Sequence, residues 1–170
     1  MKKIAILTPM LLALAALPAF AEGPHLKAEL ISFNEVPSVV SQAHGTFEGH
    51  TSGDWNSIEF ELTYSGLQAP VTQAHIHLAQ RAVNGPIVVW LCGTASNPGP
   101  TGTATCPQSG TVRGTITAAN VLASPASQQL FAGALGDFIV AVDAGFGYAN
   151  VHTAVSGGGE IRGQINPPKN

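Results

Sequence analysis

The chain has 170 residues, which is the length of a single domain. Hydrophobic residues make up 45% of it and charged residues only 10%, with 19 glycines and 12 prolines, and this composition favours short strands joined by turns over a bundle of helices. Seven basic side chains against ten acidic ones give a formal charge of -3. The sequence contains no block of Lys or Arg residues that could contact a phosphate backbone along its length, so nucleic acid is not an expected partner.

The first 21 residues have the pattern of a secretory signal peptide. Met1-Lys2-Lys3 is positively charged, Ile4 to Leu17 is almost entirely apolar, and Ala19-Phe20-Ala21 has small residues at both positions that a signal peptidase recognises. The apolar run is shorter than the roughly 20 residues that a membrane-spanning helix needs. We expect cleavage after Ala21, a mature domain over residues 22–170 with no membrane span, and a bacterial periplasmic or secreted location.

The two cysteines, Cys92 and Cys106, are expected to form a disulfide, because an oxidising compartment favours one. On the chain-entropy model, closing a loop of about 15 residues is worth roughly 3 kcal/mol. That is enough to hold the Thr-, Gly- and Pro-rich segment between them in one place. The alternative is two separate buried thiols.

Alternating apolar and polar residues predict strands along most of the mature chain. The clearest case follows Trp55, where Ile58, Phe60, Leu62 and Tyr64 share one face. The predicted strands cover residues 26–31, 58–64, 71–78, 87–91, 111–117, 138–143, 148–155 and 160–165.

One helix is predicted from Ser124 to Leu135, with Pro125 in its first turn and Gly136 after its end. About eight strands and one short helix indicate an all-β domain, a Greek-key sandwich or barrel.

Three histidines lie on predicted strands in a suggestive pattern. His75 and His77 are two residues apart and so project from the same face, while Ala74 and Ile76 project to the apolar face. By the same alternation, His152 lies on the outer face of its strand. We expect all three imidazoles to face away from the core.

Three neutral imidazoles with a fourth position for water or another side chain suit Cu(II) or Zn(II), and copper binds more tightly where both are present. The sequence therefore predicts a surface metal site at His75, His77 and His152. The candidates for an additional ligand are Glu35, His44, His50 and Asp143.

Other kinds of site are excluded or poorly supported. The mature chain would contain no Met and no free Cys for a blue-copper site, and Pro24 lacks the amide that an amino-terminal copper clamp needs. No Ser, Cys or His arrangement indicates a hydrolase. Gly157-Gly158-Gly159 leads into another strand and is predicted to be a hairpin turn. Glu160 and Arg162 in that strand share a face and are predicted to lie at the surface or rim, where they could pair with charges across the strands.

Several segments together resemble the CHRD domain, the module named after chordin and also found alone in secreted bacterial proteins. The resemblance covers roughly Leu26 to Ile165. The matching segments are Asn34-Glu35-Val36-Pro37, Leu62-Thr63-Tyr64-Ser65-Gly66-Leu67, Ala74-His75-Ile76-His77, Asn84-Gly85-Pro86-Ile87-Val88, Tyr148-Ala149-Asn150-Val151-His152-Thr153 and Gly159-Glu160-Ile161-Arg162-Gly163-Gln164.

This resemblance implies an immunoglobulin-like β fold and makes both histidine segments signature elements. In chordin the repeats belong to an extracellular protein that binds growth factors. His-x-His on a small Greek-key protein also resembles copper-zinc superoxide dismutase at the level of fold, but that enzyme's bridging-histidine and zinc-loop pattern is missing.

The expected function is therefore binding of a copper or zinc ion, for metal handling or redox chemistry, with catalysis the less favoured outcome. The alternatives are a metal-free extracellular module that recognises a protein partner and a copper enzyme resembling superoxide dismutase. Geometry discriminates between binding and no binding. Three imidazole nitrogens within about 4 Å of a common point would favour a metal site, and scattered nitrogens would favour the module.

Overall fold

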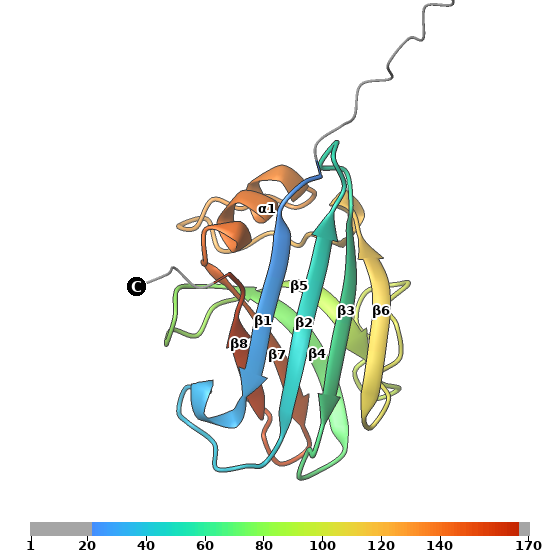
Figure 1. The fold of residues 1–170 in the computed structure, drawn as a ribbon, viewed down its shortest axis with the longest axis vertical. Coiled ribbons are helices and arrows are strands. Elements are labelled where there is room, and N and C mark those ends of the chain that lie inside the picture. The colour runs from blue at the N-terminus through green and yellow to red at the C-terminus, as the bar shows by residue number, and fades with distance from the viewer. Residues whose placement is uncertain (1–21, 167–170) are drawn as a thin grey trace, which may run out of the picture.

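The computed structural model describes residues 22–166, which form one continuous antiparallel sheet (Figure 1). The strands lie in the order β5-β4-β7-β8-β1-β2-β3-β6, and the sheet curls until β5 approaches β6, giving a nearly closed barrel. The predicted all-β class with one helix is confirmed. The predicted signal peptide lies outside the described residues.

The elements have the following bounds. The strands are β1 (His25–Ile31), β2 (His44–Thr51), β3 (Ile58–Ser65), β4 (Val71–Leu78), β5 (Ile87–Gly93), β6 (Gly110–Ile116), β7 (Gly147–Thr153) and β8 (Ile161–Gln164), and the helices are η1 (Ser32–Asn34), η2 (Ala118–Asn120) and α1 (Leu135–Asp143).

The barrel core is filled by side chains from alternate positions of the strands. On β3, the predicted apolar face is fully inside, with Ile58 and Leu62 at 0% exposure. On β4, Ala74 and Ile76 are equally buried. This alternation sends the intervening side chains of β4, including both of its histidines, away from the core.

Strand β2 was not predicted, because its inward positions carry little hydrophobic signal. Phe47 is the only large apolar residue on that face, and Gly45 and Gly49 flank it. A Cβ on Gly45 would collide with the backbone oxygen of Thr63 on β3, so close approach of β3 requires a glycine there.

The predicted helix and the strand after it are both wrong. The segment 124–134 forms turns, in which Ser124 N donates to the oxygen of Leu130, and the helix α1 begins at Leu135 and occupies the region predicted as a strand over 138–143. Leu135, Phe138 and Val142, together with Ile139, have the spacing of one helical face, and all are buried. The β-branched residues in this run are of types that favour strands, but the buried apolar residues have the spacing of a helix. In Figure 1, α1 lies across one end of the barrel.

The predicted disulfide between Cys92 and Cys106 is confirmed, and neither cysteine is free. It joins the end of β5 to the segment before β6, where Cys106 N also donates to the oxygen of Gly93. The bridge therefore anchors edge strand β5, which carries Trp90.

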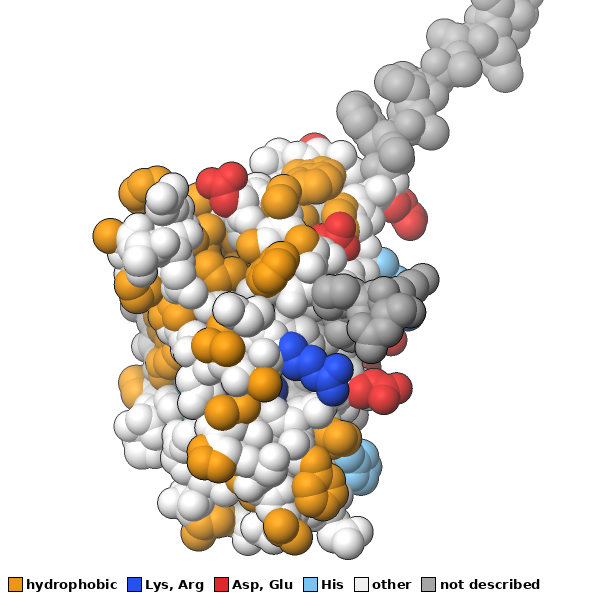
Figure 2. Space-filling model, turned by 90° about the vertical axis from the view of Figure 1, so that its left-hand side faces the viewer, with side chains coloured by type: hydrophobic (Ala, Val, Ile, Leu, Met, Phe, Trp, Pro, Cys, Tyr) orange, Lys and Arg blue, Asp and Glu red, His pale blue; other side chains and the backbone are white. Residues whose placement is uncertain are grey.

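The surface is poor in charge, as the composition predicts. Figure 2 shows apolar side chains in several separate patches on one side of the molecule, with few charged side chains among them. Within residues 22–166, no helix is both long and apolar enough to cross a membrane.

Candidate metal centre

Strands β4 and β7 bring the three predicted histidines together. The two strands are antiparallel neighbours, with His75 opposite Asn150 and Gln73 opposite His152. One ring nitrogen from each of His75, His77 and His152 can be chosen so that all three lie within 4.8 Å of one another. Three atoms this close share a centre no more than about 2.8 Å from each, which is close to the 2.0–2.1 Å of zinc–nitrogen bonds. A three-histidine metal site is therefore geometrically possible.

The prediction of a surface site was wrong, because the cluster is buried. His75, His77 and His152 are exposed to 0%, 7% and 5%. Their side chains do point away from the core, but residues 79–86 and 154–160 cover this outer face of the sheet. The oxygens of Gly85 and Gly157, which contact His77 and His152, come from these two segments.

Backbone carbonyls fix the orientation of two of the three rings. His77 Nδ1 lies 2.9 Å from the oxygen of Gly85, and His152 Nδ1 lies 3.0 Å from the oxygen of Gly157. Because a carbonyl oxygen only accepts, each Nδ1 carries the proton and each Nε2 carries a lone pair. Metal-binding histidines in proteins are commonly held in this way.

The third ring stands beside the free nitrogen of His152. His75 Nδ1 is 3.2 Å from His152 Nε2. Two nitrogens bound at about 2.0–2.1 Å to one tetrahedral or square-planar ion are about 2.9–3.4 Å apart, so this separation suits two ligands of one metal. It also suits an N–H···N hydrogen bond between the two rings.

Two buried nitrogens of the cluster have no hydrogen-bond partner, namely His75 Nε2 and His77 Nε2. A buried acceptor without a partner costs about 1–3 kcal/mol. Burial lowers the pKa of His75 to about 2 and that of His77 to about 4, and it also lowers the pKa of His152. All three rings are therefore neutral near pH 7, which is the protonation state that binds metal.

Aromatic side chains support the cluster from two sides. Trp90 on β5 meets His75 edge to face at 4.3 Å between ring centroids, and Tyr148 on β7 stacks on His77 at 4.7 Å and 3°. The β4–β5 register shifts on both sides of the His75–Ile76 pair, which is the kind of irregularity that re-aims side chains next to sites. Ring rotation at the cluster is thereby restricted.

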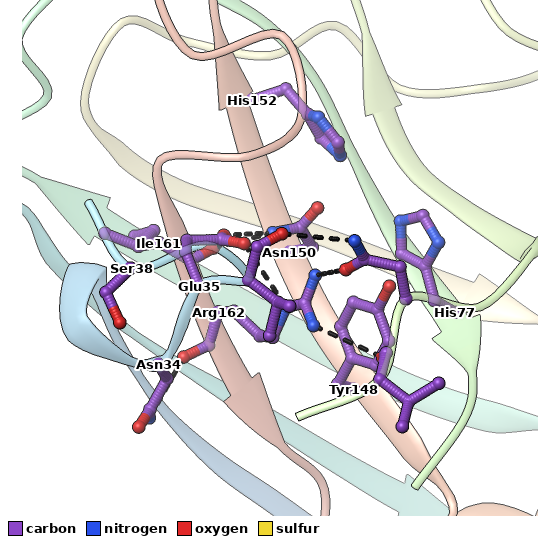
Figure 3. A network of polar contacts seen from close by, with 12 residues as sticks. Asn34, Glu35, Ser38, His77, Tyr148, Asn150, His152, Ile161 and Arg162 are labelled. Atoms are coloured by element: carbon purple, nitrogen blue, oxygen red, sulfur yellow. Dashed lines mark hydrogen bonds and ion pairs between the residues drawn. The ribbon is translucent and has the colours of Figure 1, made fainter. Parts of the chain in front are cut away.

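A buried ion pair lies next to the histidines (Figure 3). Arg162 Nε is 3.3 Å from Glu35 Oε2, and the guanidinium carbon lies 3.9 Å from the centre of the Tyr148 ring. Tyr148 separates Arg162 on β8 from His77, which is the cross-strand partner of Tyr148 on β4. Asn150 Nδ2 donates both to Glu35 Oε1 and to the oxygen of Ile161. The predicted surface position of Arg162 is wrong, since it is only 4% exposed.

The residue before Ile161 was mispredicted in the same way. Glu160 is fully buried and accepts hydrogen bonds from Ser41 Oγ at 2.7 Å, Gln68 N at 2.9 Å and Thr153 Oγ1 at 2.8 Å. Its carboxylate ties the segment after β7 to the chain before β2 and before β4. The turn predicted at residues 157–159 is thus held against His152, which contacts the oxygen of Gly157.

Comparison with protein families decides what kind of domain this is. A family model for the CHRD domain matches residues 26–165, nearly the whole chain. The chain belongs to the CHRD domain family. Neither the curated proteins nor the solved structures gave a match. Both histidine segments, and Glu35, Asn150 and Arg162, lie within the matched range of the CHRD domain.

The candidates for a fourth ligand are scattered over the CHRD domain. Glu35 belongs to the polar network beside the cluster, and its carboxylate is engaged by Asn150 and Arg162. His44 is exposed at the start of β2 and lies 3.1 Å from Ser65 Oγ, and Asp143 at the end of α1 accepts a hydrogen bond from Asn166. His50 belongs to a second, exposed group on β1 and β2.

Sequence reasoning missed the supporting residues of this cluster. Trp90, Tyr148 and Asn150 contact the histidines or their neighbours, but none has a spacing that marks it out. A signal did exist for two of them, because Tyr148 and Asn150 fall inside a motif shared with the CHRD family. Joining that motif to the one that holds His75 and His77 requires the pairing of strands, which periodicity does not provide.

Proposed function

We propose that this CHRD domain is a secreted or periplasmic protein that binds one copper or zinc ion through His75, His77 and His152 and serves to handle that metal. The observation that carries the proposal is the convergence of three buried neutral imidazoles, two of which keep an unpartnered nitrogen. A metal ion would bind the free nitrogen of His77, together with His75 Nδ1 and His152 Nε2, which lie 3.2 Å apart.

Copper is the preferred ion in this proposal. Three imidazoles suit both copper and zinc, and affinities for such sites rise from zinc to copper(II). The disulfide supports an oxidising compartment, because such bridges persist in the periplasm and outside cells. The signal-like pattern at residues 1–21 supports the same location.

The residues around the cluster have separate roles in this proposal. The carbonyls of Gly85 and Gly157 hold the Nδ1 protons of His77 and His152, so that Nε2 faces the ion. Trp90 and Tyr148 keep the rings in place, and the covering segments exclude water. A bound copper ion would supply one-electron redox chemistry, such as superoxide disproportionation, and this chain would then be an enzyme as well as a metal carrier.

The test is elemental analysis of the full chain, purified without a histidine tag and incubated with copper or zinc before removal of loose ions. We expect about one retained ion per chain, because an ion enclosed by residues 79–86 and 154–160 exchanges slowly, whereas ions on exposed side chains are removed with the loose ions. The variant His75→Ala/His77→Ala/His152→Ala should lose it, and His44→Ala should keep it, because His44 is an exposed histidine outside the cluster.

Folding must be separated from binding in this test. His77→Phe keeps an aromatic ring against Tyr148 and removes only the nitrogens, so it should fold, with an unchanged far-ultraviolet circular dichroism spectrum, and lose the metal. If the wild-type chain retains neither copper nor zinc, the proposal is overturned and the metal-free module becomes the better hypothesis.

A further inference from the structure

We propose a second, solvent-exposed site for a divalent transition-metal ion on the outer face of the β1–β2 hairpin, formed by His25, His50 and Glu48. One ligand atom from each of these residues can be chosen so that all three lie within 4.8 Å of one another. The three residues are exposed, in contrast to the buried cluster on β4 and β7. This inference does not rest on the proposed function.

The two histidines are direct cross-strand partners. His25 on β1 is opposite His50 on β2. The preceding pair, Pro24 and Thr51, is hydrogen-bonded, since Thr51 N donates to the oxygen of Pro24. Hydrogen-bonded and non-hydrogen-bonded pairs alternate along an antiparallel ladder, so His25 and His50 occupy a non-hydrogen-bonded pair, where side chains stand closest.

The ring geometry agrees with this register. The imidazoles of His25 and His50 are stacked, with centroids 4.0 Å apart and planes 27° apart. The backbone of the strand pair therefore holds the two imidazole rings together before any ion binds, and rotation of the side chains turns one nitrogen of each towards a common ion. Such pre-positioning reduces the conformational entropy that binding removes.

Carboxylates complete the donor set. Glu48 is two residues before His50 and so projects from the same face of β2. Glu59 on β3 is the exposed cross-strand partner of His50 on its other side. Lys27 pairs with Glu48 at 3.7 Å, but both side chains are at least half exposed, and such pairs are worth little, so an ion can displace the lysine.

The donor set selects the class of ion. Two imidazole nitrogens with one or two carboxylate oxygens suit Zn²⁺, Cu²⁺ or Ni²⁺, whereas Mg²⁺ and Ca²⁺ prefer oxygen ligands alone. Because the site is exposed, its ion exchanges directly with the solution. The exposed group thus differs from the buried cluster in its access to the solution.

The test uses Zn²⁺ as the probe and chemical modification as the readout. Diethyl pyrocarbonate reacts with exposed neutral imidazoles, and a bound metal protects them. In the full chain without a histidine tag, Zn²⁺ should slow modification of His25 and His50, measured by peptide mass spectrometry. His44 is the internal control, because it is exposed on the same face of β2 but has Ile31 and Ser65 as its strand partners.

Variants identify the ligands. His50→Ala should raise the Zn²⁺ concentration that half-protects His25 by about tenfold or more, equivalent to at least ~1.4 kcal/mol, and Thr46→Ala on the same face should leave it unchanged. Mg²⁺ should give no protection. Equal modification of His25 and His50 with and without Zn²⁺, or equal protection of His44, would overturn the inference.

To separate the exposed site from the buried cluster, the protection measurement is repeated on the variant His77→Phe. Protection of His25 and His50 should persist there, because the exposed group shares no residue with His75, His77 and His152. Loss of protection in that variant, with the fold intact, would contradict an independent second site. Failure of the buried site alone would leave the protection of His25 and His50 intact.

Discussion

The fold shifts the pKa of Glu35 into a range where the effect on stability can be measured. It is 4% exposed, and burial raises its pKa to about 7, although Arg162 and the Asn150 amide favour the charged form. An unburied glutamic acid has a pKa of 4.5. Between these two values the folded protein holds a proton that the unfolded chain releases.

The stability contributed by Glu35 should therefore fall as pH rises from about 4.5 to 7, by at most about 1.4 kcal/mol per pH unit. Comparison with Glu35→Gln isolates this residue, because the other titrating groups contribute equally to both proteins. Urea unfolding at pH 4.5, 5.5, 6.5 and 7.5 should show the wild type losing stability relative to the variant at each step. Parallel curves for the two proteins would contradict the raised pKa of Glu35.

Gly159 allows the polar network to approach the covering turn. Its φ is +122°, and a Cβ there would collide with Asn150 Nδ2 and Glu35 Oε1. Gly159→Ala should destabilise the protein by at least about 1–3 kcal/mol, from backbone strain and the displaced network. Gly158→Ala is the matched control, because a Cβ there meets nothing within 4 Å, and it should change stability by less than about 1 kcal/mol. Denaturant titration of both variants measures the difference, and equal values would refute the steric argument.

At the residue level, alternation predicted which faces the histidines occupy but not their burial. His75 and His77 do share a face, and Ala74 and Ile76 occupy the other. Their enclosure depends on Gly85 and Gly157, which come from segments without any periodic signal, and on Trp90 of strand β5, whose pairing with β4 periodicity does not reveal. The burial of Glu160 and Arg162 escaped prediction for the same reason, because their partners are distant in the sequence.

The elements show where hydrophobic periodicity succeeds and fails. It located β3 and β4, whose inward residues are large and apolar. It missed β2, where Gly45 and Gly49 take inward positions, and it placed a strand on α1, whose Phe138, Ile139 and Val142 favour strands by type but have helical spacing. The predicted strand count survived only because these two errors offset each other.

Strand β5 is held at the edge of the sheet by pairing with β4 and by the disulfide. Replacing both cysteines, Cys92→Ser/Cys106→Ser, should lower the free energy of unfolding by about 3 kcal/mol, because the unfolded chain regains the freedom of a loop of about 15 residues. Urea denaturation checks this value. The metal content should stay unchanged, since the β4–β5 pairing through Trp90 and His75 needs no sulfur. An unfolding free energy equal to that of the wild type would mean that the bridge adds no stability.

At the scale of the whole molecule, the candidate metal centre connects parts that the chain separates. His75 and His77 lie on β4, and His152 lies 75 residues beyond His77 on β7. The covering segments 79–86 and 154–160 directly follow these two strands. An ion bound to all three rings would have to leave before β4 and β7 could separate. Metal binding and global unfolding should thus be linked.

The linkage predicts a midpoint of thermal unfolding that depends on metal concentration. An ion that binds only the folded state at a hundred times its Kd adds about 2.7 kcal/mol, which for a domain of this size corresponds to a rise of about 5–10 °C. To exclude the exposed group, the titration uses His50→Ala as the background protein. Scanning calorimetry with copper or zinc should show the rise there and its loss in the further variant His77→Phe. An unchanged midpoint in the background protein at all metal concentrations would mean that the buried rings do not bind the ion, and that their enclosure by residues 79–86 and 154–160 is purely structural.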